Sequence, residues 1–292
     1  MKRIITGLCF CFLITTINAQ TFDRWAQVVH WDGISHWSRY MITLPAYQGP
    51  NSLPVPRMSS GTADTNFYIG VTGQFHFSEG DKTQNAVLYL NYPLVKNKIS
   101  FDASFVPYEH YKLDQHTIEK RHVFSQFYYD NSAVGEIHLN TNIQLLNKWR
   151  KYIQLALRVG YRFPCGSGFG AARNTDGPGY YFDLSIGKPF GQSPFKWINM
   201  FGFYAWQIES DKFNQDDAVL FGSGFEYNTK KWELQTCIAT YLGYLGTDGD
   251  KPVVYRFNAT RKWKHWGAIL NFQQGLHDVF YSTVEGGVRY NF

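Results

Sequence analysis

Polar and apolar residues alternate strictly along many stretches of this chain. Between Glu136 and Leu146, in EIHLNTNIQLL, polar residues occupy every second position, with an apolar residue or threonine between them. This period of two predicts a β-strand with one polar and one apolar face. A soluble β-sandwich and a membrane barrel both contain such strands, so this stretch alone leaves open whether the apolar face meets a protein core or lipid.

Similar segments follow one another from Asn66 to the C-terminus, separated by breaks rich in Gly, Asn, Asp, Ser or Lys. We place twelve strands at residues 66–78, 83–94, 98–108, 134–145, 150–163, 178–189, 194–209, 217–229, 231–244, 251–262, 265–275 and 279–292. Most span about 10–14 residues, longer than the ~5–6 of an average soluble strand, which suits a tilted strand that crosses a bilayer.

The two faces stay distinct from strand to strand. In YIQLALRVGYRF, residues 152–163, large apolar side chains alternate with a set that contains Arg158 and Arg162, and the last segment interleaves apolar residues with Glu285 and Arg289. In a soluble barrel, the large aromatic residues of twelve long strands would overfill one small core. An apolar face toward lipid and a polar face toward the lumen fit better.

The breaks between the predicted strands alternate in length. Those at 95–97, 146–149, 190–193, 230 and 263–264 are short, and those at 109–133, 164–177, 210–216 and 245–250 are longer. Outer-membrane barrels have short periplasmic turns and longer outer loops. An even number of strands also predicts that both termini lie on the periplasmic side.

Four of the short turns place a lysine beside a tryptophan. The pairs are Lys148–Trp149, Lys196–Trp197, Lys231–Trp232 and Lys262–Trp263. Indole rings prefer the headgroup level of a bilayer, where lysine stems can also reach the aqueous phase. We therefore predict that Trp149, Trp197, Trp232, Trp263, Trp266 and Phe292 lie at one membrane interface. The alternative is that these are loop tryptophans by coincidence.

The stretch from Asn66 to Phe292 resembles the outer-membrane β-barrel proteins of Gram-negative bacteria. Its terminal GGVRYNF, an alternating strand that closes on an aromatic residue, is similar to the C-terminal strand signature of that class. The resemblance implies insertion into the outer membrane by the barrel-assembly machinery, and it points to no subfamily or substrate. We expect an all-β, antiparallel up-and-down transmembrane barrel of about 12 strands over residues 66–292.

The N-terminus has the layout of an export signal. Lys2 and Arg3 precede an apolar run from Ile4 to Ile14, and INAQ predicts cleavage after Ala19. Residues 1–19 are therefore predicted to be a signal peptide. Without them only two cysteines remain, Cys165 and Cys237, which excludes a disulfide scaffold. The mature chain is expected in the outer membrane.

Residues 20–65 do not fit a membrane-spanning strand. They contain prolines at positions 45, 50, 54 and 56, which cannot donate to a strand ladder. Three arrangements remain open for this segment. It could be a periplasmic extension that packs on the barrel rim through Trp25, Trp31 and Trp37, a plug in the lumen, or a lone strand over residues 38–44.

The predicted lumen face carries charges of both signs. Its candidate lining residues are Glu136, His138, Arg158, Arg162, Asp183, Glu226, Arg256, Glu285 and Arg289. They could form an internal ion-pair network that stiffens the barrel, or they could line a pore that selects small polar or ionic solutes. Twelve strands fall between the filled eight-stranded barrel and the open barrel of sixteen or more, so the strand number does not decide.

Catalytic, metal and nucleic-acid functions find little support in the sequence. The predicted loop 109–133 holds several candidate residues, Glu109, His110, His116, Glu119, His122 and Ser125, but its histidine spacing matches no standard zinc site. The acidic stretches at 211–217 and 248–250 lack the twelve-residue ligand pattern of a calcium-binding EF-hand loop. The 28 basic residues, two of them in the signal peptide, against 23 acidic ones give no nucleic-acid footprint.

The sequence therefore favours a narrow channel or transporter for small polar solutes, with no catalytic residues, metal or cofactor. The alternative is a non-conducting accessory barrel of a larger outer-membrane assembly or export complex, closed by ion pairs and the N-terminal segment. A lipid-modifying enzyme is a third, less favoured hypothesis. The expected partners are the lipid bilayer, the barrel-assembly machinery and other subunits of such a complex.

Overall fold

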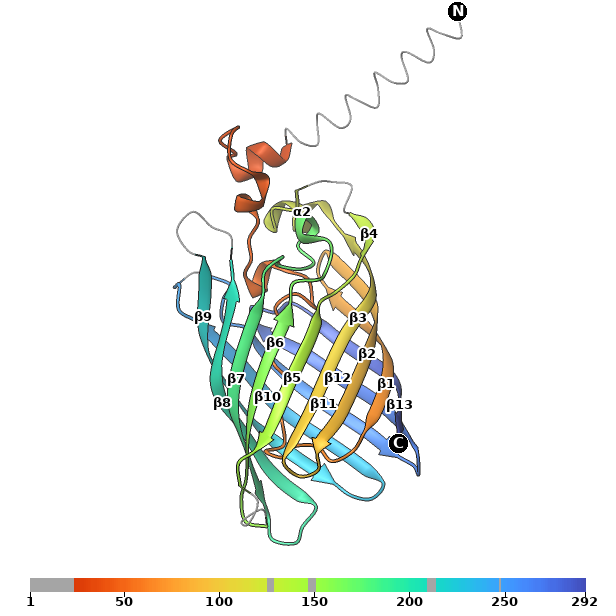
Figure 1. Cartoon of the computed structure of the whole chain (residues 1–292). Coiled ribbons are helices and arrows are strands. Elements are labelled where there is room, and N and C mark those ends of the chain that lie inside the picture. Colours follow the sequence, from red (N-terminus) through yellow and green to blue (C-terminus); the bar gives the residue numbers. More distant parts are fainter. Residues whose placement is uncertain (1–23, 125–128, 147–150, 209–213, 247) are drawn as a thin grey trace, which may run out of the picture.

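Twelve long antiparallel strands close into one barrel (Figure 1). The computed structural model describes residues 24–124, 129–146, 151–208, 214–246 and 248–292. The barrel strands are β1 (Tyr68–Ser78), β2 (Asp81–Val95), β3 (Ile99–Leu113), β5 (Ile137–Gln144), β6 (Gln154–Phe163), β7 (Gly179–Pro189), β8 (Phe195–Gln207), β9 (Gln215–Asn228), β10 (Trp232–Gly243), β11 (Val253–Lys262), β12 (Trp266–His277) and β13 (Ser282–Asn291). Pairing of β1 with β13 closes the ring.

The twelve strands predicted from the alternating pattern are confirmed. The largest difference is at β3, which continues past the predicted end at residue 108 and pairs with a short strand, β4 (Asp130–Ala133). The predicted loop 109–133 therefore begins as a strand and also contains a short helix, α2 (Gln115–Lys120), whose first turn is capped by the side chain of Asp114. Shifts in the β2–β3 register occur near Pro93 and Pro107, which cannot donate to the ladder.

The outer face of the barrel is apolar and the inner face is largely polar. Phe75 and Val284 are exposed and lie opposite one another in the β1–β13 ladder. The adjacent inward pair, Gln74 and Glu285, is buried. Because successive side chains of a strand point to opposite faces, this register sends one full set of apolar residues outward. The result is the inverse of a soluble barrel, as the sequence pattern predicted.

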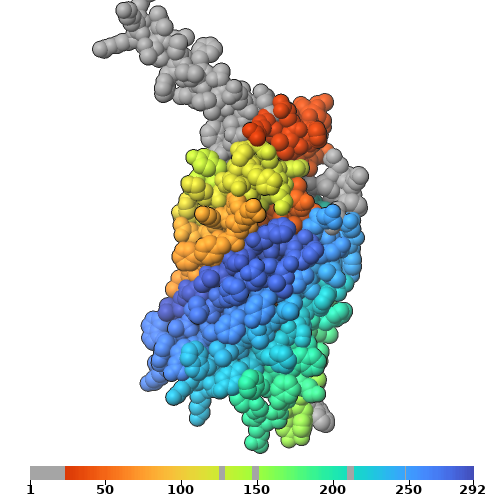
Figure 2. Space-filling view, turned by 180° about the vertical axis from the view of Figure 1, so that it is seen from behind, coloured from red at the N-terminus to blue at the C-terminus, as the bar shows by residue number. Residues whose placement is uncertain are grey.

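The two ends of the barrel differ. The turns that follow β2, β7, β9 and β11 lie at the same end as the C-terminus, which we call the turn end (Figure 1). The longer connections that follow β3, β6, β8 and β10 lie at the opposite end, which we call the loop end. Figure 2 shows the back of the molecule, where the β3–β5 connection and the N-terminal residues cover the loop end above a continuous wall of strands.

The N-terminal segment crosses the inside of the barrel. Residues 24–47, with the 3-10 turns η1 (Trp37–Tyr40) and η2 (Pro45–Tyr47), lie at the loop end, and residues 48–66 run along the lumen to the start of β1 at the turn end (Figure 1). Residues 38–44 contain η1 in place of a strand. The expectation that both termini share one end therefore holds for β1 and β13, but residue 24 lies at the other end.

The tryptophans of this segment pack at the loop end. The indole of Trp25 donates to the carbonyl of His122 over 3.0 Å, and the ring of Trp37 stacks on Phe124 with centroids 4.5 Å apart. Both partners belong to the β3–β5 connection.

Among the described residues, no helix is long and apolar enough to cross a membrane.

Candidate functional site in the lumen

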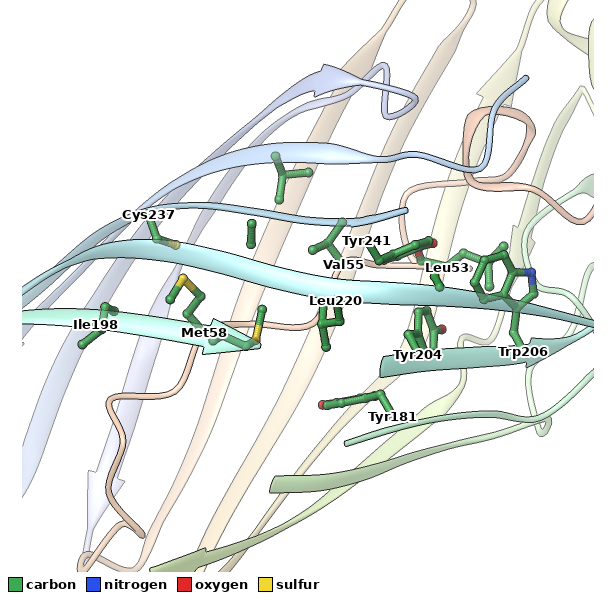
Figure 3. Close-up of a cluster of buried hydrophobic side chains, with 14 of the residues drawn as sticks. Leu53, Val55, Met58, Tyr181, Ile198, Tyr204, Trp206, Leu220, Cys237 and Tyr241 are labelled. Carbon is green, nitrogen blue, oxygen red and sulfur yellow. The ribbon is translucent and has the colours of Figure 1, made fainter. Parts of the chain in front are cut away.

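One side of the lumen is an apolar strip on which the N-terminal segment rests. Leu53, Val55 and Met58 are buried and pack against inward side chains of β7 to β11 (Figure 3). The strip consists of Tyr181, Ile198, Met200, Tyr204, Trp206, Ile208, Ala218, Leu220, Cys237, Ala239, Tyr241 and Val254. Sequence reasoning missed it, because the predicted lumen face was taken as polar throughout. The available signal was the weak alternation in NMFGFYAW, residues 199–206, where both faces carry apolar residues.

Inward side chains also bind the backbone of this segment. The guanidinium of Arg256 donates to the carbonyls of Val55 and Pro56, over 2.6 and 3.1 Å, and that of Arg158 donates to the carbonyl of Arg57 over 2.6 Å. Further bonds reach the carbonyls of Ser52 from Arg162, of Leu53 from Tyr241 and of Gly61 from Gln144. Proline has no backbone N–H group, so this segment forms few backbone hydrogen bonds of its own and its carbonyl oxygens lack backbone partners. Donor side chains of the barrel wall bind these carbonyls instead.

The predicted lumen charges are mostly paired with one another. Arg158 and Asp183 form an ion pair of 2.7 Å between β6 and β7, and Arg162 pairs with Glu136. Glu226 pairs with Lys196 over 3.1 Å, and Arg289 with Glu233 over 2.9 Å. Of the nine predicted lining residues, all but Asp183 border the cavity described below, and Asp183 lies fully buried beneath Arg158.

Glu285 is paired with a residue that sequence reasoning did not single out. Its carboxylate accepts from Arg57 of the N-terminal segment over 3.0 Å, and also from Thr72, Gln74 and Tyr89 over 2.7–2.9 Å. Arg57 lies in the stretch PVPR, which shows no period that would indicate its direction. Its contact with β13 follows from the path of the segment through the lumen.

A buried ion-pair layer, which we call the cap, lies at the loop end. The carboxylate of Asp81 accepts from Arg121, Arg173, Thr83 and Tyr281 over 2.5–2.8 Å, and all five side chains are buried. Arg173 also donates to Glu109 over 2.6 Å. Burial alone would lower the pKa of Arg173, but the two adjacent carboxylates raise it above its usual value. Arg173 therefore stays charged.

A second, apolar layer lies beside these ion pairs at the loop end. It consists of Met41, Tyr111, Leu113, Ile118, Val123, Ala133, Ala171 and Ala172, with Trp37, Phe124 and Phe169 packed against them. These residues come from the N-terminal segment, from β3 and its following connection, and from the β6–β7 connection. The loop end is thus covered by three parts of the chain that are distant in sequence.

A cavity of about 600 Å³ lies inside the barrel beside residues 50–66. Its lining reaches from Asn51 and His76, near the cap, to Asn228, Lys262 and Arg289 near the turn end. The volume lies within the ~300–1,000 Å³ of small-molecule sites. The lumen therefore holds space for a small molecule, and most of that space is bordered by polar side chains.

The predicted interface residues gather at the turn end. Trp197, Trp232, Trp263, Trp266 and Phe292 are all exposed, and each belongs to a short turn, to the strand end beside it or to the C-terminus. Trp149 lies outside the described residues. This placement is what a belt at one membrane surface requires, and the contact with headgroups stays a prediction.

Most of the described residues considered for catalysis are held in structural contacts. Glu109 pairs with Arg173 in the cap, His110 contacts the carbonyl of Asn131 over 3.1 Å, and His122 contacts the carbonyl of Tyr40 over 2.9 Å. His116 and Glu119 lie on α2, and Ser125 lies outside the described residues. Within the described ranges, no group of three or more His, Cys, Asp or Glu side chains is placed to hold a metal ion.

Comparisons with solved structures find the same architecture. An outer membrane channel from Pseudomonas putida F1 superimposes with a TM-score of 0.55 at 14% identity, covering 82% of this chain and 100% of the channel. The NanC porin gives a TM-score of 0.51 at 9% identity, covering 77% of this chain and 100% of the porin. The chain has the fold of the outer-membrane β-barrel channels. No family model and no curated protein sequence matches it, so these similarities establish the fold of the barrel and not its subfamily.

Proposed function

We propose that this outer-membrane barrel is a narrow channel for small polar solutes. The observation that carries the proposal is the polar cavity of about 600 Å³ inside a closed barrel of twelve strands. Its length, from the cap to the turn end, makes it the natural path for a solute. Two similar solved barrels are described as an outer membrane channel and a porin, which supports a channel function without identifying the solute.

The proposal also places the protein in its membrane. The apolar outer wall and the aromatic residues of the turn end support integration in the outer membrane, with the turn end toward the periplasm. Insertion would use the barrel-assembly machinery after removal of residues 1–19. The loop end, with the cap and residues 24–47, would then face the outside.

Single-channel conductance in a planar bilayer tests this function. The mature protein should carry a small, stable current, because the N-terminal segment and the cap narrow the lumen. A variant without residues 20–63 should carry a larger current, since the segment no longer occupies the lumen. Silence in both proteins would contradict the channel function.

A second function is favoured by the same segment. Inward side chains of the barrel donate hydrogen bonds to backbone carbonyls of the N-terminal segment, including those of Ser52 and Gly61. The side chains of the cap are buried. These contacts favour a non-conducting barrel that is a subunit of a larger envelope complex. That hypothesis predicts that the gently solubilised protein co-purifies with stoichiometric partners. A lone monomer that conducts would exclude it.

A further inference from the structure

The charges that border the cavity balance. Six cationic side chains line it, Arg57, Arg158, Arg162, Arg256, Lys262 and Arg289. Six anionic side chains also line it, Asp64, Asp102, Glu136, Glu226, Glu233 and Glu285. Equal numbers of each sign give the lining a formal net charge of zero. This differs from a pore built on a ring of like charges.

These charges are also engaged within the protein. Arg57, Arg158, Arg162 and Arg289 each pair with a carboxylate, while Arg256 is held by Gln273 and by two backbone carbonyls. Glu136 Oε1, Arg162 Nε and Nη2, and Arg289 Nε are buried without a hydrogen-bond partner among the described residues. An ionic solute that displaced one of the paired carboxylates would leave a charge unpaired inside the barrel. That is costly in a low-dielectric interior. A solute without charge would not need to break any ion pair.

The remaining polar lining is rich in amides. Eleven asparagine and glutamine residues border the cavity. An amide side chain offers both donors and an acceptor, which is the combination that a hydroxyl group can satisfy in either direction. Tyr68, Tyr89, Tyr181 and Tyr204 border the same space. The lining therefore contains both donor and acceptor groups.

The amides are positioned on opposite walls. On β5, Asn140 and Asn142 each donate to one oxygen of Asp102, over 2.6 and 2.7 Å, so their side chains are fixed. On β11, Asn258 donates to Gln235 of β10 over 3.0 Å. In the ring of twelve strands β5 and β11 are six strands apart, so the two clusters lie on opposite sides of the barrel. For the amide oxygens of Asn142 and Asn258, the described residues supply no donor.

We propose that the cavity binds an uncharged, hydroxyl-rich solute of about sugar size, held between the amide cluster of Asp102, Asn140 and Asn142 and that of Gln235 and Asn258. This rests on the proposed channel function and names its solute class. The charged residues of the lining stiffen the path and take no part in selecting ions.

Binding of three matched probes to the detergent-solubilised full-length protein tests the proposal, by saturation-transfer NMR. The probes are glucose, glucuronate and glucosamine, which share a ring and differ in charge. Glucose should bind at least about tenfold more tightly than either ion. The double variant Asn142→Leu, Asn258→Leu should weaken glucose binding by at least about tenfold. Asn131→Ala, an exposed residue of the β3–β5 connection that lies outside the cavity lining, should leave glucose binding unchanged.

The outcomes separate the solute class from the channel function. Equal or tighter binding of glucuronate or glucosamine, or no binding of glucose, would overturn the proposal even if the protein conducts. Glucose binding by a barrel that stays silent in a planar bilayer would keep the site and reject the channel. A double variant that binds glucose like the unmodified protein would place the sugar elsewhere and also overturn the proposal.

Discussion

Asp81→Asn should destabilise the barrel by several kcal/mol. The carboxylate accepts four hydrogen bonds, two of them from the buried guanidinium groups of Arg121 and Arg173. The substitution keeps the shape of the side chain and removes its charge. Arg173 keeps its pair with Glu109, but Arg121 keeps only neutral acceptors, the new amide oxygen and the hydroxyl of Tyr281, 2.8 Å away. One buried cation is thus left without a carboxylate.

The magnitude follows from that single unpaired cation. Removing one partner of a buried ion pair costs about 3–5 kcal/mol, because the charge left behind stays desolvated. Glu109→Gln is the matched control. It removes Glu109 from Arg173, but Arg173 keeps its pair with Asp81. No guanidinium is then left without a carboxylate, so the loss in free energy of unfolding should be smaller, about 1–3 kcal/mol. The order of the two variants is therefore predicted as well as the size.

Both free energies of unfolding can be measured by urea unfolding of the refolded protein in detergent. Unfolding is followed by tryptophan fluorescence and by the heat-dependent gel shift of the folded barrel. In the Asp81→Asn background, a second substitution of Arg121→Met should recover part of the lost stability, since the unpaired charge is gone. A loss below about 0.5 kcal/mol for Asp81→Asn, the range of ordinary surface substitutions, would refute the reasoning that the cap is a buried ionic layer.

Three further predictions concern the N-terminal segment. Gly187→Ala should release the N-terminal segment and make residues 48–65 more susceptible to protease, because a Cβ at position 187 would lie 2.4 Å from the carbonyl oxygen of Ser60. Gly73→Ala, where a Cβ would meet open space, should leave the protease susceptibility unchanged. Leu53→Ala should cost about 2–5 kcal/mol in urea unfolding, since Leu53 is buried in the apolar strip, and a cost near zero would mean that the segment does not dock there. Arg162→Met should cost about 3–5 kcal/mol, because Glu136 would be left unpaired. Arg57→Met should cost less, about 1–3 kcal/mol, because half of its side chain is exposed and the buried Glu285 keeps three other donors; equal losses for these two arginines would contradict the assignment of partners.

The strands could be predicted from sequence because each faces two different environments. Alternating apolar and polar residues predict both a strand and its register. In β1 and β13, outward Phe75 and Val284 are paired, as are inward Gln74 and Glu285. The same argument fails where both faces are apolar. Residues 199–206 face lipid on one side and the N-terminal segment on the other, so their pattern reveals a strand but hides the apolar strip in the lumen.

The path of the N-terminal segment could not be predicted, because much of its attachment is made by its backbone carbonyls and its side chains show no regular period. Arg158 and Arg256 bind carbonyl oxygens, which every residue possesses. The prolines of PVP fix an extended backbone without giving a period. The cap was missed for a related reason. Arg121 and Arg173 lie in polar connections, where charged residues are ordinarily solvated, and only the folded structure brings them to one carboxylate.

The segment is fixed at both ends, which under the proposed function limits how the lumen opens. Residue 66 leads directly into β1 at the turn end, while Trp25 and Trp37 are packed into the loop end. One side of the segment is docked on the apolar strip through Leu53, Val55 and Met58, and the other borders the cavity. Removing the docked side from the strip would expose apolar surface in a polar lumen, whereas rearranging the cap would leave that surface covered. Under the proposed function the segment therefore acts as part of the channel wall, and opening depends on the cap at the loop end.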